Sequence, residues 1–126
     1  MRGGVFLQAP DSTNDHDIAF FTIGDEAGPS GAGRSTVGLY HLAWEVQTLG
    51  DLQETALALQ AEGAMVGASD HGTTKSIYAH DPDGLEFEVC WVVPPDLLGD
   101  LSQSMEMLPL NIPGEIERYG ALTPGR

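Results

Sequence analysis

The residues of this 126-residue chain whose types and spacing could do chemistry gather around one short segment. The run SDHGTTKSIYAHDPDGLEFEVCW, residues 69–91, contains His71 and Tyr78 before a turn and Glu88 after it, and His41 precedes the run. A neutral imidazole and a carboxylate both suit a divalent first-row metal, and two histidines with one carboxylate form a facial triad that leaves three coordination positions open. His41 and Glu88 would supply two of those three ligands.

Strand alternation brings these side chains onto shared faces. Residues 38–46 alternate in polarity, which predicts a half-buried strand with His41 on its less apolar face. Residues 75–81 and 86–93 predict two further strands joined by the turn Asp-Pro-Asp-Gly. If these strands are neighbours, their polar side chains line one face of a sheet, as a site would require. The side chains expected there are His41, Ser76, Tyr78, His80, Glu86, Glu88 and Cys90.

The pattern of residues 39–93 predicts strand, helix, strand, strand and strand in that order. Thr48 followed by Asp51 resembles a helix N-cap with an acid in the first turn, and apolar residues recur at helical spacing until Gly63. Residues 64–69 then predict the second strand. One compact unit of four strands and one helix is therefore expected in the middle of the chain.

Two strand-like segments precede this unit. Residues 4–10 and 17–23 are rich in β-branched and aromatic residues and flank a turn-forming segment, so they predict a hairpin. Residues 24–38 are dominated by glycine, serine, alanine and proline, which predicts a mobile connection.

The chain after residue 93 predicts a tail. Prolines alternate with short amphipathic pieces at 96–107 and 113–119, which favours a segment that wraps the sheet or a partner subunit. The closing ALTPGR is expected to fray.

Composition limits the class of partner. The length is typical of a single domain, and a formal charge of −14 repels phosphate backbones and anionic lipid, which argues against nucleic acid and membrane surfaces. Small neutral or cationic ligands remain open. No apolar run is long enough to span a bilayer or to serve as a secretion signal, so we expect a cytoplasmic protein. The single cysteine, Cys90, lies in an apolar run and is expected to be a buried thiol without a chemical role.

Each candidate also has a purely structural explanation. His41 could be a satisfied core histidine, and Glu88 a solvated strand carboxylate. His71 could be a turn residue, Tyr78 a sheet aromatic with its hydroxyl in water, and His80 a residue that flanks a turn.

Together these residues match a known pattern. His71, Tyr78, the turn at residues 81–84 and Glu88 resemble in type and spacing the signature of type I extradiol ring-cleavage dioxygenases. Those enzymes belong to the vicinal oxygen chelate superfamily, with the glyoxalases and bleomycin resistance proteins. Ser69 departs from the signature, which prefers glycine, asparagine, threonine or a small aliphatic residue there. The segments GLYHLAWEV and DHDIAFF resemble two histidine-bearing strands of that family, so the resemblance covers about residues 4–93.

The resemblance implies an α+β fold of paired βαβββ modules, whose curved mixed sheets surround a metal. His41 and Glu88 would be metal ligands, and His71 and Tyr78 would act on the substrate. Fe(II) or Mn(II) would be the cofactor, and the substrate would be a catechol-like aromatic diol or another small molecule with two neighbouring oxygens. The chain would form one domain with four parts: a partial first module (1–23), a linker (24–38), a complete module (39–93) and a C-terminal tail (94–126).

The third metal ligand has three possible sources. His16 could serve, a second subunit could contribute a ligand, or the chain could be an amino-terminally shortened form, which the start immediately before a module's third strand favours. Because the first module is partial, apolar sheet surface is left uncovered, so a homodimer or larger self-association is expected.

Two other functions remain open on this resemblance. A glyoxalase-like or epimerase-like lyase or isomerase would use the metal to stabilise an enolate. A protein without catalysis would instead bind a small molecule such as a drug.

Overall fold

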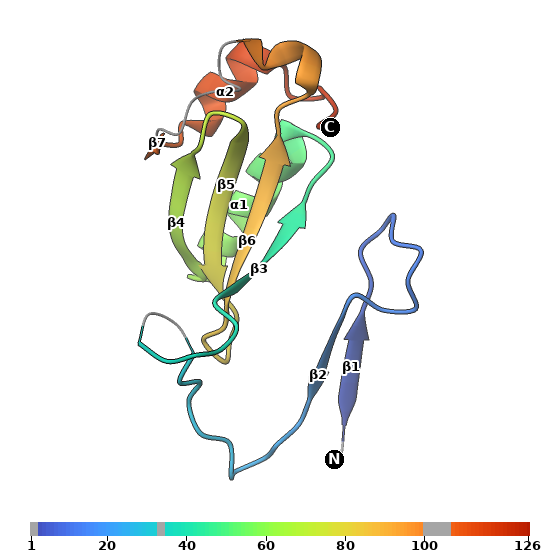
Figure 1. Cartoon of the computed structure of the whole chain (residues 1–126), viewed down its shortest axis with the longest axis vertical. Coiled ribbons are helices and arrows are strands. Elements are labelled where there is room, and N and C mark those ends of the chain that lie inside the picture. The colour runs from blue at the N-terminus through green and yellow to red at the C-terminus, as the bar shows by residue number, and fades with distance from the viewer. Residues whose placement is uncertain (1–2, 33–34, 100–106) are drawn as a thin grey trace.

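The structure, a computed structural model, describes residues 3–32, 35–99 and 107–126. Its centre is a five-stranded mixed sheet with the strand order β3-β6-β5-β4-β7 (Figure 1). Only the β3–β6 pair is parallel, while β6, β5, β4 and β7 pair antiparallel. The strands are β3 (His41–Glu45), β4 (Met65–Asp70), β5 (Thr74–His80), β6 (Glu86–Val92) and β7 (Leu108–Pro109). The βαβββ order of a vicinal oxygen chelate module is thereby confirmed, as is the α+β class.

The helix α1 (Leu49–Ala61) crosses from β3 to β4 and begins at the predicted cap. The Thr48 hydroxyl accepts a hydrogen bond from the Asp51 backbone at 3.1 Å, and the Asp51 carboxylate accepts one from the Thr48 backbone at 2.9 Å. This reciprocal capping box satisfies two amide groups that a helix start otherwise leaves unpaired. After the helix, Gly63 adopts a φ of 68°, a conformation open to glycine at little cost.

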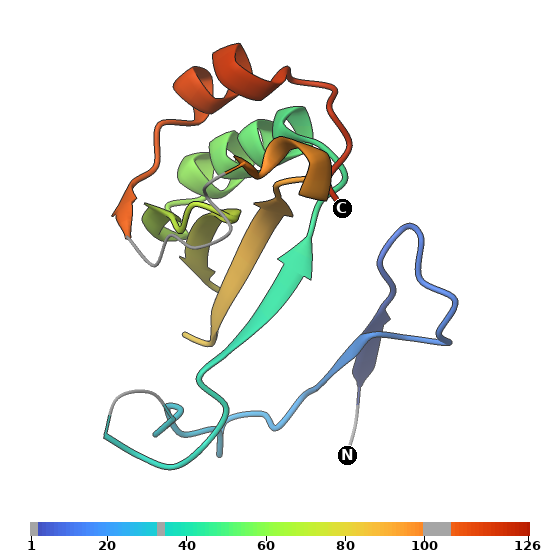
Figure 2. The same ribbon diagram turned by 45° about the horizontal axis from the view of Figure 1, so that its top comes forward.

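The core lies between one face of the sheet and α1 (Figure 2). Alternate residues of β5 and β6 point into it, as a strand buried on one face requires. The buried core residues are Leu49, Leu52, Ile77, Val89, Trp91 and Val93. Because alternation is strict, the residues between them in β5 and β6 must point to the opposite face, where the predicted polar side chains lie.

The hairpin of β1 (Gly4–Leu7) and β2 (Ile18–Phe21) forms as predicted. It is a separate two-stranded sheet and does not pair with the five-stranded one. Figures 1 and 2 both show it beyond the β3 edge, joined to the sheet through the segment after β2. A two-stranded hairpin is marginal in water by itself, so its stability depends on what it packs against.

The C-terminal segment is held more firmly than the sequence indicates. Helix α2 (Ile112–Tyr119) confirms the amphipathic piece at 113–119. The short helix η1 (Pro95–Leu97) overlaps the start of the other predicted piece, 96–107, of which residues 100–106 lie outside the described residues. The expected fraying of ALTPGR is wrong. The indole of Trp91 donates to the Thr123 carbonyl at 3.2 Å, and the Gly125 amide donates to the Gln47 carbonyl at 2.8 Å.

A buried lysine joins α2 to the sheet. The side chain of Lys75 in β5 is completely buried, and its Nζ lies 2.5 Å from Asp70 Oδ1 and 3.2 Å from Glu115 Oε2. A buried ammonium is tolerated only with such partners, since charge removed from water without a counter-ion is costly. The ion triad therefore fixes the position of α2 on the helix-bearing side of the sheet.

None of the helices among the described residues has the length and apolarity that a membrane crossing needs.

Replacing Lys75 by methionine tests the triad. The substitution leaves the carboxylates of Asp70 and Glu115 facing each other without a cation, so the free energy of unfolding should fall by about 3–5 kcal/mol. Urea unfolding followed by circular dichroism measures the loss. Adding Asp70→Asn and Glu115→Gln to Lys75→Met removes the uncompensated charges and should recover part of it. A loss below about 1 kcal/mol for Lys75→Met would show that the triad carries little stability.

Candidate functional site

Cross-strand register assembles the polar face from three neighbouring strands. Glu86 of β6 lies opposite His41 of β3 on one side and opposite His80 of β5 on the other. Glu88 lies opposite Tyr78 in the same way. The prediction that these side chains share one face is therefore confirmed.

His41 and Glu88 face each other across β3 and β6. The imidazole Nε2 lies 3.2 Å from Glu88 Oε2. The other carboxylate oxygen, Glu88 Oε1, accepts a hydrogen bond of 2.6 Å from the hydroxyl of Ser76, a residue that is completely buried. The Glu88 side chain is only 14% exposed, so its carboxylate is held with one oxygen fixed and the other directed at His41.

His71 and Tyr78 form a second pair beside the first. His71 Nε2 and the Tyr78 hydroxyl are joined by a hydrogen bond of 3.1 Å. The Tyr78 ring also lies edge-on to the His41 ring, with centroids 6.1 Å apart. Burial raises the pKa of Tyr78 above its usual value, and the negative charge of Glu88 raises it further. Tyr78 is therefore a neutral hydrogen-bond donor at physiological pH.

The turn between β4 and β5 carries His71 to this position. The His71 amide donates to the Thr74 carbonyl at 2.9 Å, and Gly72 adopts a φ of 76°. Asp70 supports the same turn, because its Oδ1 accepts from the Gly72 amide at 2.7 Å.

The donors on this face suit part of a metal site. An imidazole nitrogen and a carboxylate oxygen directed at each other are the donor types that Fe(II) and Mn(II) take in facial-triad sites. His41 Nδ1 is in addition buried and has no hydrogen-bond partner in the described part of the chain, so its hydrogen-bonding capacity is unused there. His41 and Glu88 therefore fit two positions of the expected site. Within the described ranges no group of three or more His, Cys, Asp or Glu residues is arranged to hold a metal ion.

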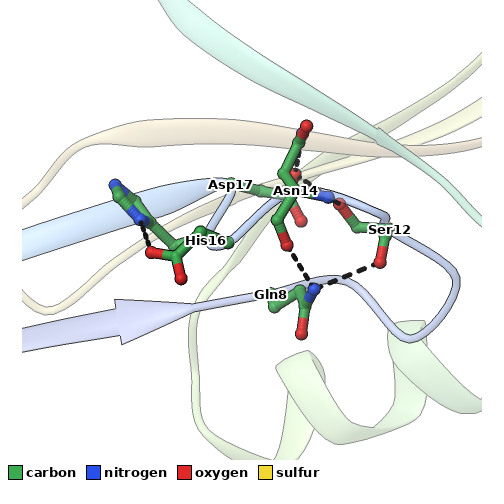
Figure 3. Close-up of polar contacts among 6 residues, drawn as sticks. Gln8, Ser12, Asn14, His16 and Asp17 are labelled. Carbon is green, nitrogen blue, oxygen red and sulfur yellow. Dashed lines mark hydrogen bonds and ion pairs between the residues drawn. The ribbon is translucent and has the colours of Figure 1, made fainter.

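His16 lies away from this pair, in the connection of the hairpin. Its Nδ1 pairs with Asp15 at 3.0 Å, and its ring lies edge-on to Phe6 with centroids 5.0 Å apart. Figure 3 shows the polar network beside it, which centres on Asp17. The Asp17 carboxylate accepts from the Ala9 amide at 2.8 Å and from the side chains of Ser12 and Asn14, and these bonds lower its pKa, the Ala9 bond most of all. The connection that carries His16 is therefore ordered by its own hydrogen bonds.

The hairpin lies toward the side of the sheet opposite the polar face. A cavity of about 440 Å³ separates the two, and its lining is almost entirely apolar. From the hairpin it is lined by Leu7, Ile18 and Phe20, and from the sheet by Leu42, Trp44, Phe87 and Val89. The sheet residues in this lining alternate with His41, Glu86 and Glu88 along their strands. The arrangement within one chain thus directs the hairpin away from His41.

Sequence reasoning did not assign roles to three residues that the structure places at or near the site. Ser76 was expected on the polar face, but not its bond to Glu88. The sequence places Glu86 on the polar face without a role and His80 beside a turn, yet the two side chains face each other, with Glu86 Oε2 3.5 Å from His80 Nε2. Their positions opposite one another follow from strand register.

Cys90 is buried as expected, and burial, followed by the charges of Glu88 and Glu45, raises its pKa to about 11.

The raised pKa of Tyr78 predicts a pH dependence. The folded state holds the phenol proton more tightly than the unfolded chain, so this group's contribution to stability is complete below pH 10 and falls as the pH rises through the folded-state pKa. The difference in ultraviolet absorbance between the unmodified chain and Tyr78→Phe isolates the titration. The midpoint should lie above 10, and Glu88→Gln should lower it without abolishing the shift, because burial is the larger cause. A midpoint at or below 10 would contradict this environment.

Comparison with known proteins gives two matches that agree with this geometry. Residues 3–89 match the family model described as the Glyoxalase/Bleomycin resistance protein/Dioxygenase superfamily. Biphenyl-2,3-diol 1,2-dioxygenase 3 of Rhodococcus globerulus is 40% identical over an alignment of 75 residues, and the match covers 55% of this chain and 36% of that protein. The match thus spans little more than a third of the relative's length. No solved structure matches significantly. Because the family model covers well over half of the sequence, the chain belongs to the Glyoxalase/Bleomycin resistance protein/Dioxygenase superfamily, which is the vicinal oxygen chelate superfamily.

Proposed function

We propose that the polar face of the five-stranded sheet is part of the active site of a metal-dependent, extradiol-type dioxygenase. Its substrate would be catechol-like, or another small molecule with two neighbouring oxygens. The observation that carries the proposal is the position of the His71–Tyr78 hydrogen bond directly beside the His41–Glu88 pair. The similarity to a biphenyl-diol dioxygenase supports the same reaction class.

His41 Nε2 and Glu88 Oε2 would hold Fe(II) or Mn(II). When bound, the metal would bring the two substrate oxygens and dioxygen into neighbouring positions and polarise them. Ser76 holds Glu88 Oε1, so Oε2 is free to face His41 and the ion. The buried position of Ser76 limits the motion of that carboxylate.

His71 and Tyr78 would handle the protons. His71 is the group suited to accept a substrate hydroxyl proton and to return it later, since an imidazole changes charge near neutral pH. Tyr78 keeps its proton because its pKa is raised, so it would donate a hydrogen bond to a substrate oxygen as negative charge develops there. The 3.1 Å bond between the two side chains orients both toward the same point.

The third metal donor would come from His16 on the hairpin of a second copy. Within one chain the hairpin lines a cavity on the opposite side of the sheet, so His16 does not join His41 and Glu88 there. Phe6, whose ring lies against His16, and Phe21, whose ring lies against Phe6, are each about half exposed on the hairpin, an apolar surface that favours association. A homodimer would then complete the site.

A second candidate, a protein that binds a small molecule without turnover, is favoured by the apolar cavity between hairpin and sheet. Its volume of about 440 Å³ lies in the range of ligand pockets. An aromatic hydrocarbon ligand would raise the melting temperature equally with and without metal if this candidate is correct. Leu42→Trp, which fills the cavity from the sheet side, should remove that effect, whereas stabilisation that needs a loaded metal would reject the candidate.

Metal content after loading tests the dioxygenase proposal. After anaerobic loading with Fe(II) or Mn(II) and desalting, the unmodified chain should retain close to one metal ion per chain, and His41→Ala, Glu88→Ala and His16→Ala should retain little. Glu45→Ala, on the same face of the sheet, is the matched control and should retain metal like the unmodified chain. A refolded mixture of His16→Ala and His41→Ala should regain part of the metal if the two donors come from different copies.

Oxygen uptake with a panel of simple catechols then tests the reaction. Uptake should require loaded metal. Its rate should fall by about two to three orders of magnitude in His71→Ala, which is the usual effect of losing a general acid–base group. Metal retention without any oxygen uptake would reject the dioxygenase, and turnover of an oxoaldehyde adduct or acyl thioester without oxygen would favour the glyoxalase-like or epimerase-like alternative.

A further inference from the structure

Glu86, the first residue of β6, lies between two histidines on the polar face. It lies on β6 directly opposite His41 of β3 and directly opposite His80 of β5. Its Oε1 is 3.8 Å from His41 Nδ1, and its Oε2 is 3.5 Å from His80 Nε2. The side chain is 25% exposed, which places its charge partly out of water.

The two glutamates of β6 face opposite nitrogens of the same imidazole. Glu88 faces His41 Nε2, and Glu86 faces His41 Nδ1. If His41 uses Nε2 toward a metal beside Glu88, its single proton must reside on Nδ1. Nδ1 is buried and has no hydrogen-bond partner among the residues that the structure describes, and a buried N–H without an acceptor is costly. Glu86 Oε1 is the carboxylate oxygen positioned to accept that proton.

A small movement of the carboxylate would close the contact. The separation of 3.8 Å exceeds hydrogen-bond length by less than about 1 Å. A cavity of about 80 Å³ adjoins Glu86 and is bordered by Tyr40 and His80, so space for that movement exists. His80 pairs with the other oxygen, which keeps Oε1 turned toward His41.

We propose that Glu86 is the positioning residue of the metal site: it accepts the Nδ1 proton of His41 and thereby directs Nε2 at the metal beside Glu88. A carboxylate on the far nitrogen fixes the tautomer and ring orientation of a metal-binding histidine and increases its basicity. The inference rests on the proposed metal role of His41. It assigns the two glutamates separate tasks, one on each nitrogen.

Metal affinity in matched variants tests the assignment. The dissociation constant for Mn(II) is measured by electron paramagnetic resonance in the unmodified chain and in Glu86→Ala, Glu86→Gln and Glu45→Gln. Glu86→Ala should weaken Mn(II) binding about 10- to 100-fold. Glu86→Gln keeps an acceptor oxygen but loses the charge, so it should lie between Glu86→Ala and the unmodified chain. Glu45→Gln removes the same charge from the same face and should change the constant less than about threefold.

The Nδ1 proton of His41 provides a second readout, which would not change if Glu86 only stabilised the fold. In the chain loaded with diamagnetic Zn(II), His41 Nδ1–H should give a slowly exchanging signal coupled to ¹⁵N. That signal should be lost in Glu86→Ala and kept in Glu45→Gln. Equal Mn(II) affinity in Glu86→Ala and Glu45→Gln, or an Nδ1–H signal unchanged by Glu86→Ala, would overturn this inference while leaving the proposed function intact. Failure of the unmodified chain to bind either metal would overturn both.

Discussion

The pairing of β6 with β3 on one side and β5 on the other is the constraint on which the rest of the structure depends. These two ladders set His41 opposite Glu86 and Tyr78 opposite Glu88. Strand side chains alternate with a period of two, so a slip of one residue in β6 would turn both glutamates into the core and bring apolar residues to the polar face. The positions of His41, Tyr78 and the two glutamates on the polar face therefore follow from register.

The opposite face of the sheet enforces that register. Ile77, Val89 and Trp91 are buried against α1, and their exposure to water would be the cost of a slip. Lys75 adds a polar constraint on the same side, because its ammonium has partners only when Asp70 and Glu115 are in place. The packing on the helix-bearing side of the sheet stabilises the fold. This stability offsets the cost of holding partly buried charged side chains on the polar face.

Much of this arrangement could be predicted from short-range patterns. The alternation of polar and apolar residues within each strand placed His41, Tyr78 and Glu88 on one face. The pair Thr48 and Asp51 located the start of α1. Each of these patterns involves residues that are close together in the sequence. Contacts between distant segments could not be predicted in this way. The burial of Lys75 depends on Glu115, forty residues later in the sequence, and the ordered C-terminus depends on Trp91 and Gln47. The side of the sheet toward which the hairpin turns could not be predicted either, because apolar residues occupy both faces of the hairpin and its strand pattern therefore favours neither side.

The central claim, that a metal binds between β3 and β6 on the polar face, is tested most directly by paramagnetic broadening. Substoichiometric Mn(II) is added to ¹⁵N-labelled protein, and the amide signals that broaden locate the ion. The account predicts that signals around His41, Tyr78 and Glu88 broaden first, and that those of α1, on the other side of the sheet, broaden only at higher Mn(II) concentrations. Broadening centred instead on exposed carboxylates, such as Asp83 in the turn before β6 or Glu54 on α1, would contradict it.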